Sequence, residues 1–364
     1  MRKQSNLKPP HRKYYIALDH VRAIACFTVF TWHFVSFGYA PKYNTPVPLF
    51  PLSFLSEGHT GVGIFMTLSA YLFAKMLDGK QIDYKAFIWS RFIRLAPLLS
   101  IVILFIGLTT QLHGGNIISY VKTIISGLIQ PVLPNGGWSI TTEFHFYLLL
   151  PFLLFLTKRS KYTLGFVLIS TIALRIFLHR KFGEIQVLSY FTIVGRIDQF
   201  ILGIMAYQFR QYFTKKHRFV ACISVMFAIL YWKFDMLGGF YNNMSYPSPS
   251  PLWIYMPTLE GLCYASIISW YDNSFQHSTG RFSRFIAAIG TYSYSIYLLH
   301  FFFFPKMANA INHYIDLRNI HLALLASIVA FLPMILIGYV SYRLIETPFF
   351  QFRIKYILEA ENSQ

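Results

Sequence analysis

The stretch SITTEFHFYLLLP, Ser139 to Pro151, places a carboxylate, Glu143, and an imidazole, His145, at the start of an apolar run. The chain contains many such runs, because 55% of its 364 residues are hydrophobic and only 13% are charged, with a mean hydropathy of +0.46. Soluble domains carry about 25% charged residues. The composition therefore indicates an all-α integral membrane protein, in which an acid inside an apolar run needs a structural or functional reason.

Ten apolar segments are long enough to cross a bilayer, which requires about 20 residues each. We predict a bundle of about ten transmembrane helices with both termini in the cytoplasm. The predicted spans are residues 18–38, 58–76, 88–112, 140–157, 162–178, 188–209, 219–236, 252–271, 285–305 and 320–344.

The segment 117–133 is also apolar, but it contains Lys122 and ends among prolines. We place it at the outer interface, because the basic clusters between later spans then face the cytoplasm, as the positive-inside rule requires. The predicted organisation is a basic cytoplasmic N-terminus, a transmembrane domain and a cytoplasmic C-terminal tail, at residues 1–17, 18–350 and 351–364.

The charge and the cysteines exclude several functions. Lys and Arg number 32 against 14 acidic residues, but the basic residues cluster at the ends of apolar runs, so topology explains the charge and nucleic acid is not an expected partner. Cys26, Cys222 and Cys263 lie in apolar runs without paired spacing or a neighbouring histidine. We expect three buried thiols, with no disulfide and no metal site.

Ionisable residues inside the spans are the candidate functional groups, because each is costly to insert. Arg22 and His33 are eleven residues apart, which places them on one helix face about 16 Å apart. Arg91 and Arg94 share a face of the third span at its cytoplasmic end, and paired guanidinium groups suit phosphates. A snorkelling arginine, a hydrogen-bonded histidine and ordinary cytoplasmic anchoring are the alternatives.

We expect the other charged residues to have mainly structural roles. Arg196 and Asp198 are two residues apart and point to different helix faces, so each needs a partner on another helix, and substrate contact is the alternative. His300 is expected to be a hydrogen-bonding residue of the outer half. We expect Glu57 and His59 to lie at the outer surface, in contact with solvent.

Glu143 and His33 are predicted to lie in the same half of the bilayer. His33 comes late in an outward span, and Glu143 comes early in an inward span. A carboxylate near a neutral imidazole can orient a general base and stabilise its protonated form. The sequence therefore places a candidate general-base pair in the outer half of the bilayer.

Seven segments, in this order, resemble acyltransferase family 3, the integral-membrane O-acyltransferases that modify cell-surface sugars. The resemblance covers nearly the whole chain, although His20 and Ala70 stand where the family usually has glycine. The segments are LDHVRAIACFTVFTWH, GVGIFMTLSAYLF, RFIRLAP, WSITTEFHFYLLLP, GRIDQFILG, SYSIYLLH and IETPF.

The resemblance implies an acyl-CoA donor, usually acetyl-CoA, which acts as a co-substrate rather than a permanently bound cofactor. It also implies a glycan or lipid-linked glycan acceptor and the bacterial cytoplasmic (inner) membrane. By the same resemblance, Arg22, Arg91 and Arg94 bind the donor phosphates and His33 is the base. Glu143 either orients His33 or contacts the acceptor. The predicted acceptor contacts are Trp138, Arg196, Asp198 and His300.

Two other functions remain open from the residues alone. The same motifs permit an acyltransferase that acts on a small molecule such as a macrolide. A transporter could also move a polar solute past buried charges, and it would show inverted repeats or broken helices. The sequence shows no internal repeat.

Overall fold

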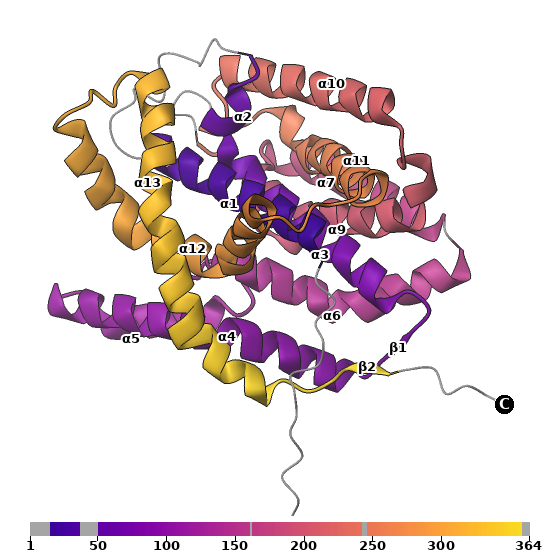
Figure 1. Ribbon diagram of the computed structural model, residues 1–364, viewed down its shortest axis with the longest axis horizontal. Coiled ribbons are helices and arrows are strands. Elements are labelled where there is room, and N and C mark those ends of the chain that lie inside the picture. The colour runs from indigo at the N-terminus through magenta and orange to yellow at the C-terminus, as the bar shows by residue number, and fades with distance from the viewer. Residues whose placement is uncertain (1–14, 37–49, 161, 242–245, 359–364) are drawn as a thin grey trace, which may run out of the picture.

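The computed structural model of the protein describes residues 15–36, 50–160, 162–241 and 246–358. The chain is about 79% helical with almost no sheet, so the all-α prediction is confirmed. Figure 1 shows the helices packed around α1 and α3. The long helices are α1 (Ile16–Ser36), α3 (Gly61–Leu77), α4 (Tyr84–Leu112), α6 (Trp138–Arg159), α7 (Thr163–Phe182), α9 (Ile193–Gln208), α10 (His217–Met236), α11 (Met256–Ser274), α12 (Arg281–Asn312) and α13 (Ile320–Ser341).

Short elements connect these helices. Two two-residue strands pair antiparallel, with Gln81 opposite Leu358 and Ile82 opposite Ile357, at what we call the strand end of the bundle. The short elements are α2 (Ser53–Ser56), η1 (Gly58–Thr60), β1 (Gln81–Ile82), α5 (Ile117–Ser126), α8 (Gln186–Phe191), η2 (Arg210–Tyr212), η4 (Pro251–Ile254), η5 (Tyr342–Glu346), η6 (Thr347–Phe352) and β2 (Ile357–Leu358).

Each predicted span coincides with one long helix, but seven helices in the described part of the chain are long and apolar enough to cross a membrane. The seven are α3, α4, α6, α7, α10, α12 and α13. The protein is therefore a multi-pass membrane protein, while the count of ten and the side of each terminus stay predictions.

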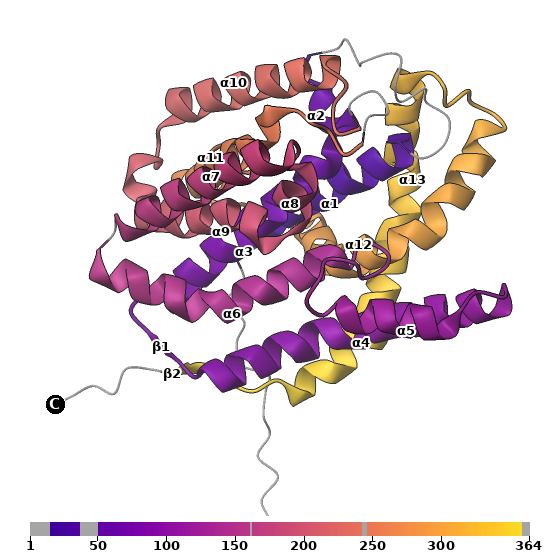
Figure 2. The ribbon, with the colours of Figure 1, turned by 180° about the vertical axis from the view of Figure 1, so that it is seen from behind.

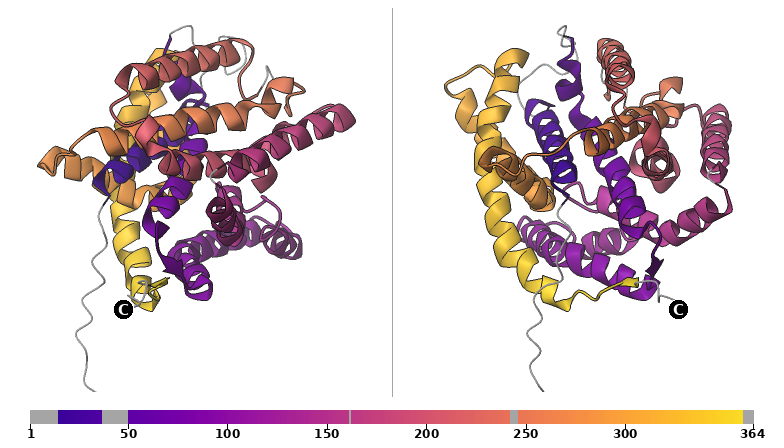
Figure 3. Two further views of the ribbon diagram at one scale, coloured as in Figure 1. Left: turned by 90° about the vertical axis from the view of Figure 1, so that its right-hand side faces the viewer. Right: turned by 45° about the vertical axis from the view of Figure 1, so that its right-hand side comes forward.

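The three remaining helices, α1, α9 and α11, are more polar because they lie inside the bundle. Most residues of α9 are buried, including Arg196 and Asp198, whereas only Leu164 and Arg175 are buried in α7. A helix surrounded by protein can carry polar side chains that would be costly against lipid. Both panels of Figure 3 show α1 and α3 within the cluster of surrounding helices.

Glycines allow α1 to pack closely on its neighbours. α1 lies against α12, α3 and α13. A Cβ atom at Gly290 of α12 would overlap the backbone carbonyl of Asp19, and one at Gly61 of α3 would lie 2.8 Å from the carbonyl oxygen of Ala25. Small residues at such contacts are typical of helices that associate within membranes.

The segment after α4 folds back along α4. α5 has ten residues and is about 15 Å long, half the thickness of the hydrocarbon layer. The hydroxyl of Tyr120 donates to the carbonyl of Ile103 over 2.6 Å, so α5 packs against the side of α4, as Figure 2 shows. α5 is too short to cross a bilayer alone.

This turn brings the start of α6 inside the bundle. The hydroxyl of Thr141 donates to the carbonyl of Gly127 over 2.6 Å, and Tyr297 of α12 donates to the carbonyl of Gly136 over 3.1 Å. The first turns of α6 therefore lie beside α12 rather than at an exposed end of the bundle. This position determines the surroundings of Glu143.

Two buried ion pairs connect the central helices. Asp198 of α9 accepts from Arg175 of α7 over 2.5 Å, and both side chains are fully buried. Arg196 of α9 lies 3.1 Å from Glu260 of α11 and donates to the carbonyl of Tyr190 over 2.7 Å. The prediction that each residue of the Arg196 and Asp198 pair binds another helix is confirmed.

The structure corrects two expectations about exposure. Glu57 and His59 are buried rather than solvated: Glu57 accepts from the backbone N–H of Phe240 over 3.0 Å, and His59 is enclosed by aromatic rings. Cys26 and Cys263 are buried thiols, as expected, but Cys222 is exposed on α10. An exposed thiol on an apolar helix is compatible with contact to lipid.

The predicted topology can be tested by thiol labelling in intact cells. In a variant that lacks the three native cysteines, Ser160→Cys in the loop after α6 is expected to resist an impermeant maleimide, because this loop is predicted to be cytoplasmic. Ser119→Cys in α5 is the matched exposed control and should react readily. Strong labelling at residue 160 would reverse the predicted orientation.

Loss of Asp198 is expected to destabilise the bundle. Asp198→Ala leaves the buried Arg175 without its anion, which costs about 3–5 kcal/mol. Thermal unfolding in detergent micelles should show a lower midpoint. The double variant Arg175→Met/Asp198→Leu removes both charges and should recover most of the loss, whereas a single variant as stable as the parent would contradict the proposed pairing.

Candidate active site

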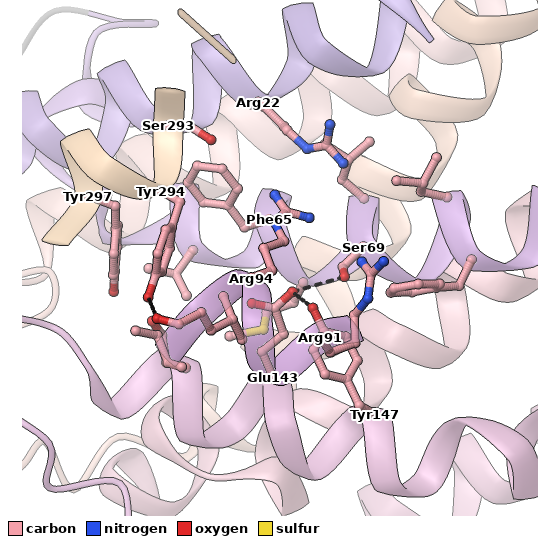
Figure 4. Close-up of a pocket in the computed structure, with 18 residues that line it drawn as sticks. Arg22, Phe65, Ser69, Arg91, Arg94, Glu143, Tyr147, Ser293, Tyr294 and Tyr297 are labelled. Atoms are coloured by element: carbon pink, nitrogen blue, oxygen red, sulfur yellow. Dashed lines mark hydrogen bonds between the residues drawn. The ribbon is translucent and has the colours of Figure 1, made fainter. Parts of the chain in front are cut away.

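One pocket collects three arginines from two helices. Arg22 comes from α1, and Arg91 and Arg94 come from the first half of α4, where their i, i+3 spacing places them on one face. Figure 4 shows the three side chains entering the same space. The other walls come from α3, α6 and α12, and their polar members are Ser69, Ser139, Glu143, Tyr147, Ser293, Tyr294 and Tyr297.

Glu143 lies in this pocket, and its carboxylate has defined partners. Ser69 of α3 donates to it over 3.2 Å, and Tyr147, one helical turn further along α6, donates to the same oxygen. Glu143 thus lies among the arginines, because α6 begins inside the bundle, and its pairing with His33 stays a prediction.

The arginine pocket carries more positive than negative charge. Arg22 pairs with Asp19 one turn earlier on α1. The pocket lining contains three guanidinium groups and one carboxylate, that of Glu143. Two more carboxylates lie nearby, since Asp19 pairs with Arg22 and Glu346 interacts with Arg94. The excess in the lining is compatible with a polyanionic ligand, because arginine binds phosphates through paired N–H groups.

Arg91 is held more firmly than a surface arginine. Its guanidinium carbon lies 5.3 Å from the ring centre of Phe73 and 5.3 Å from that of Tyr356, whose hydroxyl accepts from Nη2 over 2.9 Å. Its Nε is buried and has no hydrogen-bond partner among the described residues. The side chain is thus fixed in place while part of its donor capacity is unused.

His33 lies beside His300, with 5.0 Å between the ring centres. Nδ1 of His300 lies 2.6 Å from the carbonyl oxygen of Tyr297, which can only accept, so Nδ1 carries the proton. Nε2 of His300 is then a lone-pair acceptor, and it is buried without a partner in the described structure. Neutral imidazole in this form can accept a proton.

Tyr297 connects the histidine pair to the arginine pocket. Its side chain lines the pocket, and its ring centre lies 5.9 Å from that of His300. Arg22 and His33 are separated by eleven residues of one continuous helix, or about 16 Å. The site therefore has an arginine region toward the strand end and a histidine region further along α1.

The remaining predicted site residues fall into two groups. Trp138 belongs to an aromatic cluster, with its ring centre 5.1 Å from that of Tyr190, which in turn lies 5.4 Å from His59. Arg196 and Asp198 do not line the arginine pocket and are fully buried in their ion pairs. Their arrangement supports a role in packing the bundle.

Sequence patterns could have identified some of the residues that the prediction missed. Arg175 and Glu260, the partners in the two buried ion pairs, are charged residues inside predicted spans and satisfy the rule that selected Arg196 and Asp198. Ser69 and Tyr147 lie within the quoted motifs but gave no separate signal. Tyr356 lies beyond the last motif, and no sequence pattern indicated its contact with Arg91.

The sequence matches the profile of a family described as an acyltransferase domain over residues 15–343, nearly the whole chain. The chain belongs to acyltransferase family 3. A search of curated proteins and a search of solved structures each gave no match. Membership of the family makes the protein a membrane acyltransferase, and the pocket and the histidine pair are the candidate parts of its active site.

Proposed function

We propose that this acyltransferase moves an acyl group, most simply acetyl, from acyl-CoA to a hydroxyl of a cell-surface polysaccharide or its lipid-linked precursor, in the bacterial cytoplasmic membrane. The main supporting observation is the convergence of Arg22, Arg91 and Arg94 on one pocket. Tyr297 of its lining lies 5.9 Å from His300, which is adjacent to His33. Coenzyme A carries several phosphate charges at one end and the reactive thioester at the other. The separated arginine and histidine regions suit such a donor.

The donor phosphates would bind in the arginine region. Arg91 and Arg94 lie near the start of α4, at the end of the bundle that the charge distribution predicts to be cytoplasmic. Acyl-CoA made in the cytoplasm would enter there. The long pantetheine arm would then follow the face of α1 from Arg22 toward His33 and carry the thioester to the histidine pair.

His33 would act as the general base. The acceptor oxygen forms a bond to the thioester carbonyl carbon while its proton moves to His33. The carbon–sulfur bond then breaks, and His33 returns the proton to the departing thiolate of coenzyme A. Histidine suits this exchange because its unperturbed pKa lies nearest to neutral pH.

The acceptor would approach from the side of the aromatic cluster. Trp32 immediately precedes His33 on α1. Its ring centre lies 5.5 Å from that of His59 and 5.3 Å from that of Phe240. Aromatic rings with polar edges provide an amphipathic surface, which suits a sugar with both apolar and hydroxyl-bearing faces. Trp138 and His300 remain the proposed acceptor contacts in this region.

Removal of either pocket arginine of α4 is expected to weaken donor binding. Arg91→Ala and Arg94→Ala each remove a charge-assisted contact, so the dissociation constant of coenzyme A should rise by about tenfold or more. Titration calorimetry on the full-length protein in nanodiscs measures this constant.

Arg159→Ala is the matched control, since Arg159 is an exposed arginine at the end of α6, outside the pocket. It should bind coenzyme A as the parent does. Unchanged binding by both Arg91→Ala and Arg94→Ala would show that these residues only anchor α4 at the membrane surface.

Removal of His33 is expected to abolish transfer while donor binding is retained. Positioned proton transfer contributes about a hundred- to ten-thousandfold in rate, so His33→Ala should lose activity by a factor in this range. Mass spectrometry of surface glycans, with expression of the variant verified, measures the product in cells. His300→Ala is expected to cost less.

His113→Ala, which changes an exposed histidine after α4, is the control and should act normally. Near-normal acylation by well-expressed His33→Ala would exclude this mechanism. The base would then have to be sought among His300, Glu143 and His59.

A further inference from the structure

The C-terminal segment Arg353–Leu358 is fastened to the first turns of α4, close to the arginine pocket. Ser90 donates to the carbonyl of Ile354 over 2.8 Å, and the backbone N–H of Asp83 donates to the carbonyl of Tyr356 over 2.9 Å. The next two residues form β2, which pairs with β1. These contacts come from both sides of Tyr356 and fix its position relative to α4.

Tyr356 completes an aromatic cage around Arg91. The guanidinium carbon lies 5.3 Å from the ring centre of Phe73, 5.6 Å from that of Phe87 and 5.3 Å from that of Tyr356. The rings come from α3, α4 and the C-terminal segment. Tyr356 is the member that also accepts a hydrogen bond from the guanidinium, over 2.9 Å.

The cage restricts Arg91 without using all of its donors. A free arginine side chain loses considerable rotamer entropy when it binds a ligand, and a side chain that is already held loses less. One Nη2 hydrogen is given to Tyr356, while the buried Nε has no partner in the described part of the chain. A fixed cation that lines the pocket can bind an anionic oxygen with little further loss of side-chain entropy.

We propose that Tyr356 is a positioning residue for the acyl-CoA donor: it holds Arg91 in the orientation that binds a donor phosphate. This inference rests on the proposed function, because it takes the arginine pocket as the donor site. It goes beyond the family, since the matched region ends at residue 343 and Tyr356 lies outside it. A segment predicted to be only a cytoplasmic tail thereby becomes part of the donor site.

A double-mutant cycle tests the proposal. Tyr356→Phe keeps the ring and removes the hydroxyl that accepts from Arg91. Coenzyme A, which binds without reacting, is titrated into the full-length protein in nanodiscs for the parent, Tyr356→Phe, Arg91→Ala and the double variant. The dissociation constant does not depend on the fraction of protein that folds, so a reduced yield leaves the comparison valid.

We expect Tyr356→Phe alone to weaken coenzyme A binding by about two- to tenfold, the range for one immobilised flexible side chain. In the Arg91→Ala background the same change should have no further effect, because Tyr356 acts through Arg91. In steady-state assays, Tyr356→Phe should raise KM for the acyl donor while kcat is unchanged. Tyr314→Phe, at a tyrosine that is 86% exposed, is the control and should alter neither.

The outcomes separate this inference from the proposed function. If Arg91→Ala weakens binding and Tyr356→Phe does not, the positioning role is excluded and the donor site is retained. Equal losses from Tyr356→Phe in both backgrounds would also exclude it, because Tyr356 would then act independently of Arg91. If Arg91→Ala itself binds coenzyme A normally, the role of Tyr356 is excluded, whereas the donor site is excluded only if Arg94→Ala also binds normally.

Discussion

Ionised side chains within a membrane protein must be paired with opposite charges, because a buried charge left alone costs several kcal/mol. Arg175 with Asp198 and Arg196 with Glu260 satisfy this requirement, and together they join α9 to α7 and α11. The polar central helices are stable for two reasons. Their charged side chains are paired, and the more apolar helices around them separate them from lipid. The order of the bundle, with polar helices inside, follows from this pairing.

The arginine pocket is arranged differently from these ion pairs. Asp198 has partners on two other helices, and Arg175 uses its guanidinium on four acceptors. The pocket lining contains three arginines and one carboxylate, and the Nε of Arg91 has no acceptor among the residues described. Charges that are balanced stabilise the fold, whereas an excess of one sign at a pocket favours a ligand of the other sign.

The sequence predicted the helices well because their signal is local. A run of about 20 apolar residues must be helical in a membrane, so the predicted span 219–236 and the observed α10, His217–Met236, nearly coincide. The clustering of Arg91 with Arg94 also follows from helical spacing. Arg22 joins them only because α1 packs against the other helices. The family resemblance implied this cluster, whereas residue spacing alone did not indicate it.

The sequence failed where a position depends on how distant segments fold. The sequence did not indicate that Glu143 lies among the arginines, because its span was assumed to begin at the surface, whereas α6 begins inside the bundle after α5 turns back. His59 was predicted to be solvated, yet Phe240 and Trp253, far along the chain, cover it. Tyr356 meets Arg91 across 265 residues, and neither residue type nor spacing indicates such a contact.

The pairing of β1 with β2 has a consequence for synthesis of the protein. A ribosome makes residues 353–358 after every long helix, so α4 enters the membrane before the segment that holds Arg91 exists. A nascent chain can therefore have all its long helices in place while one wall of the Arg91 cage is still missing. The arginine pocket reaches its final form only after residues 353–358 have been made and have packed against the start of α4.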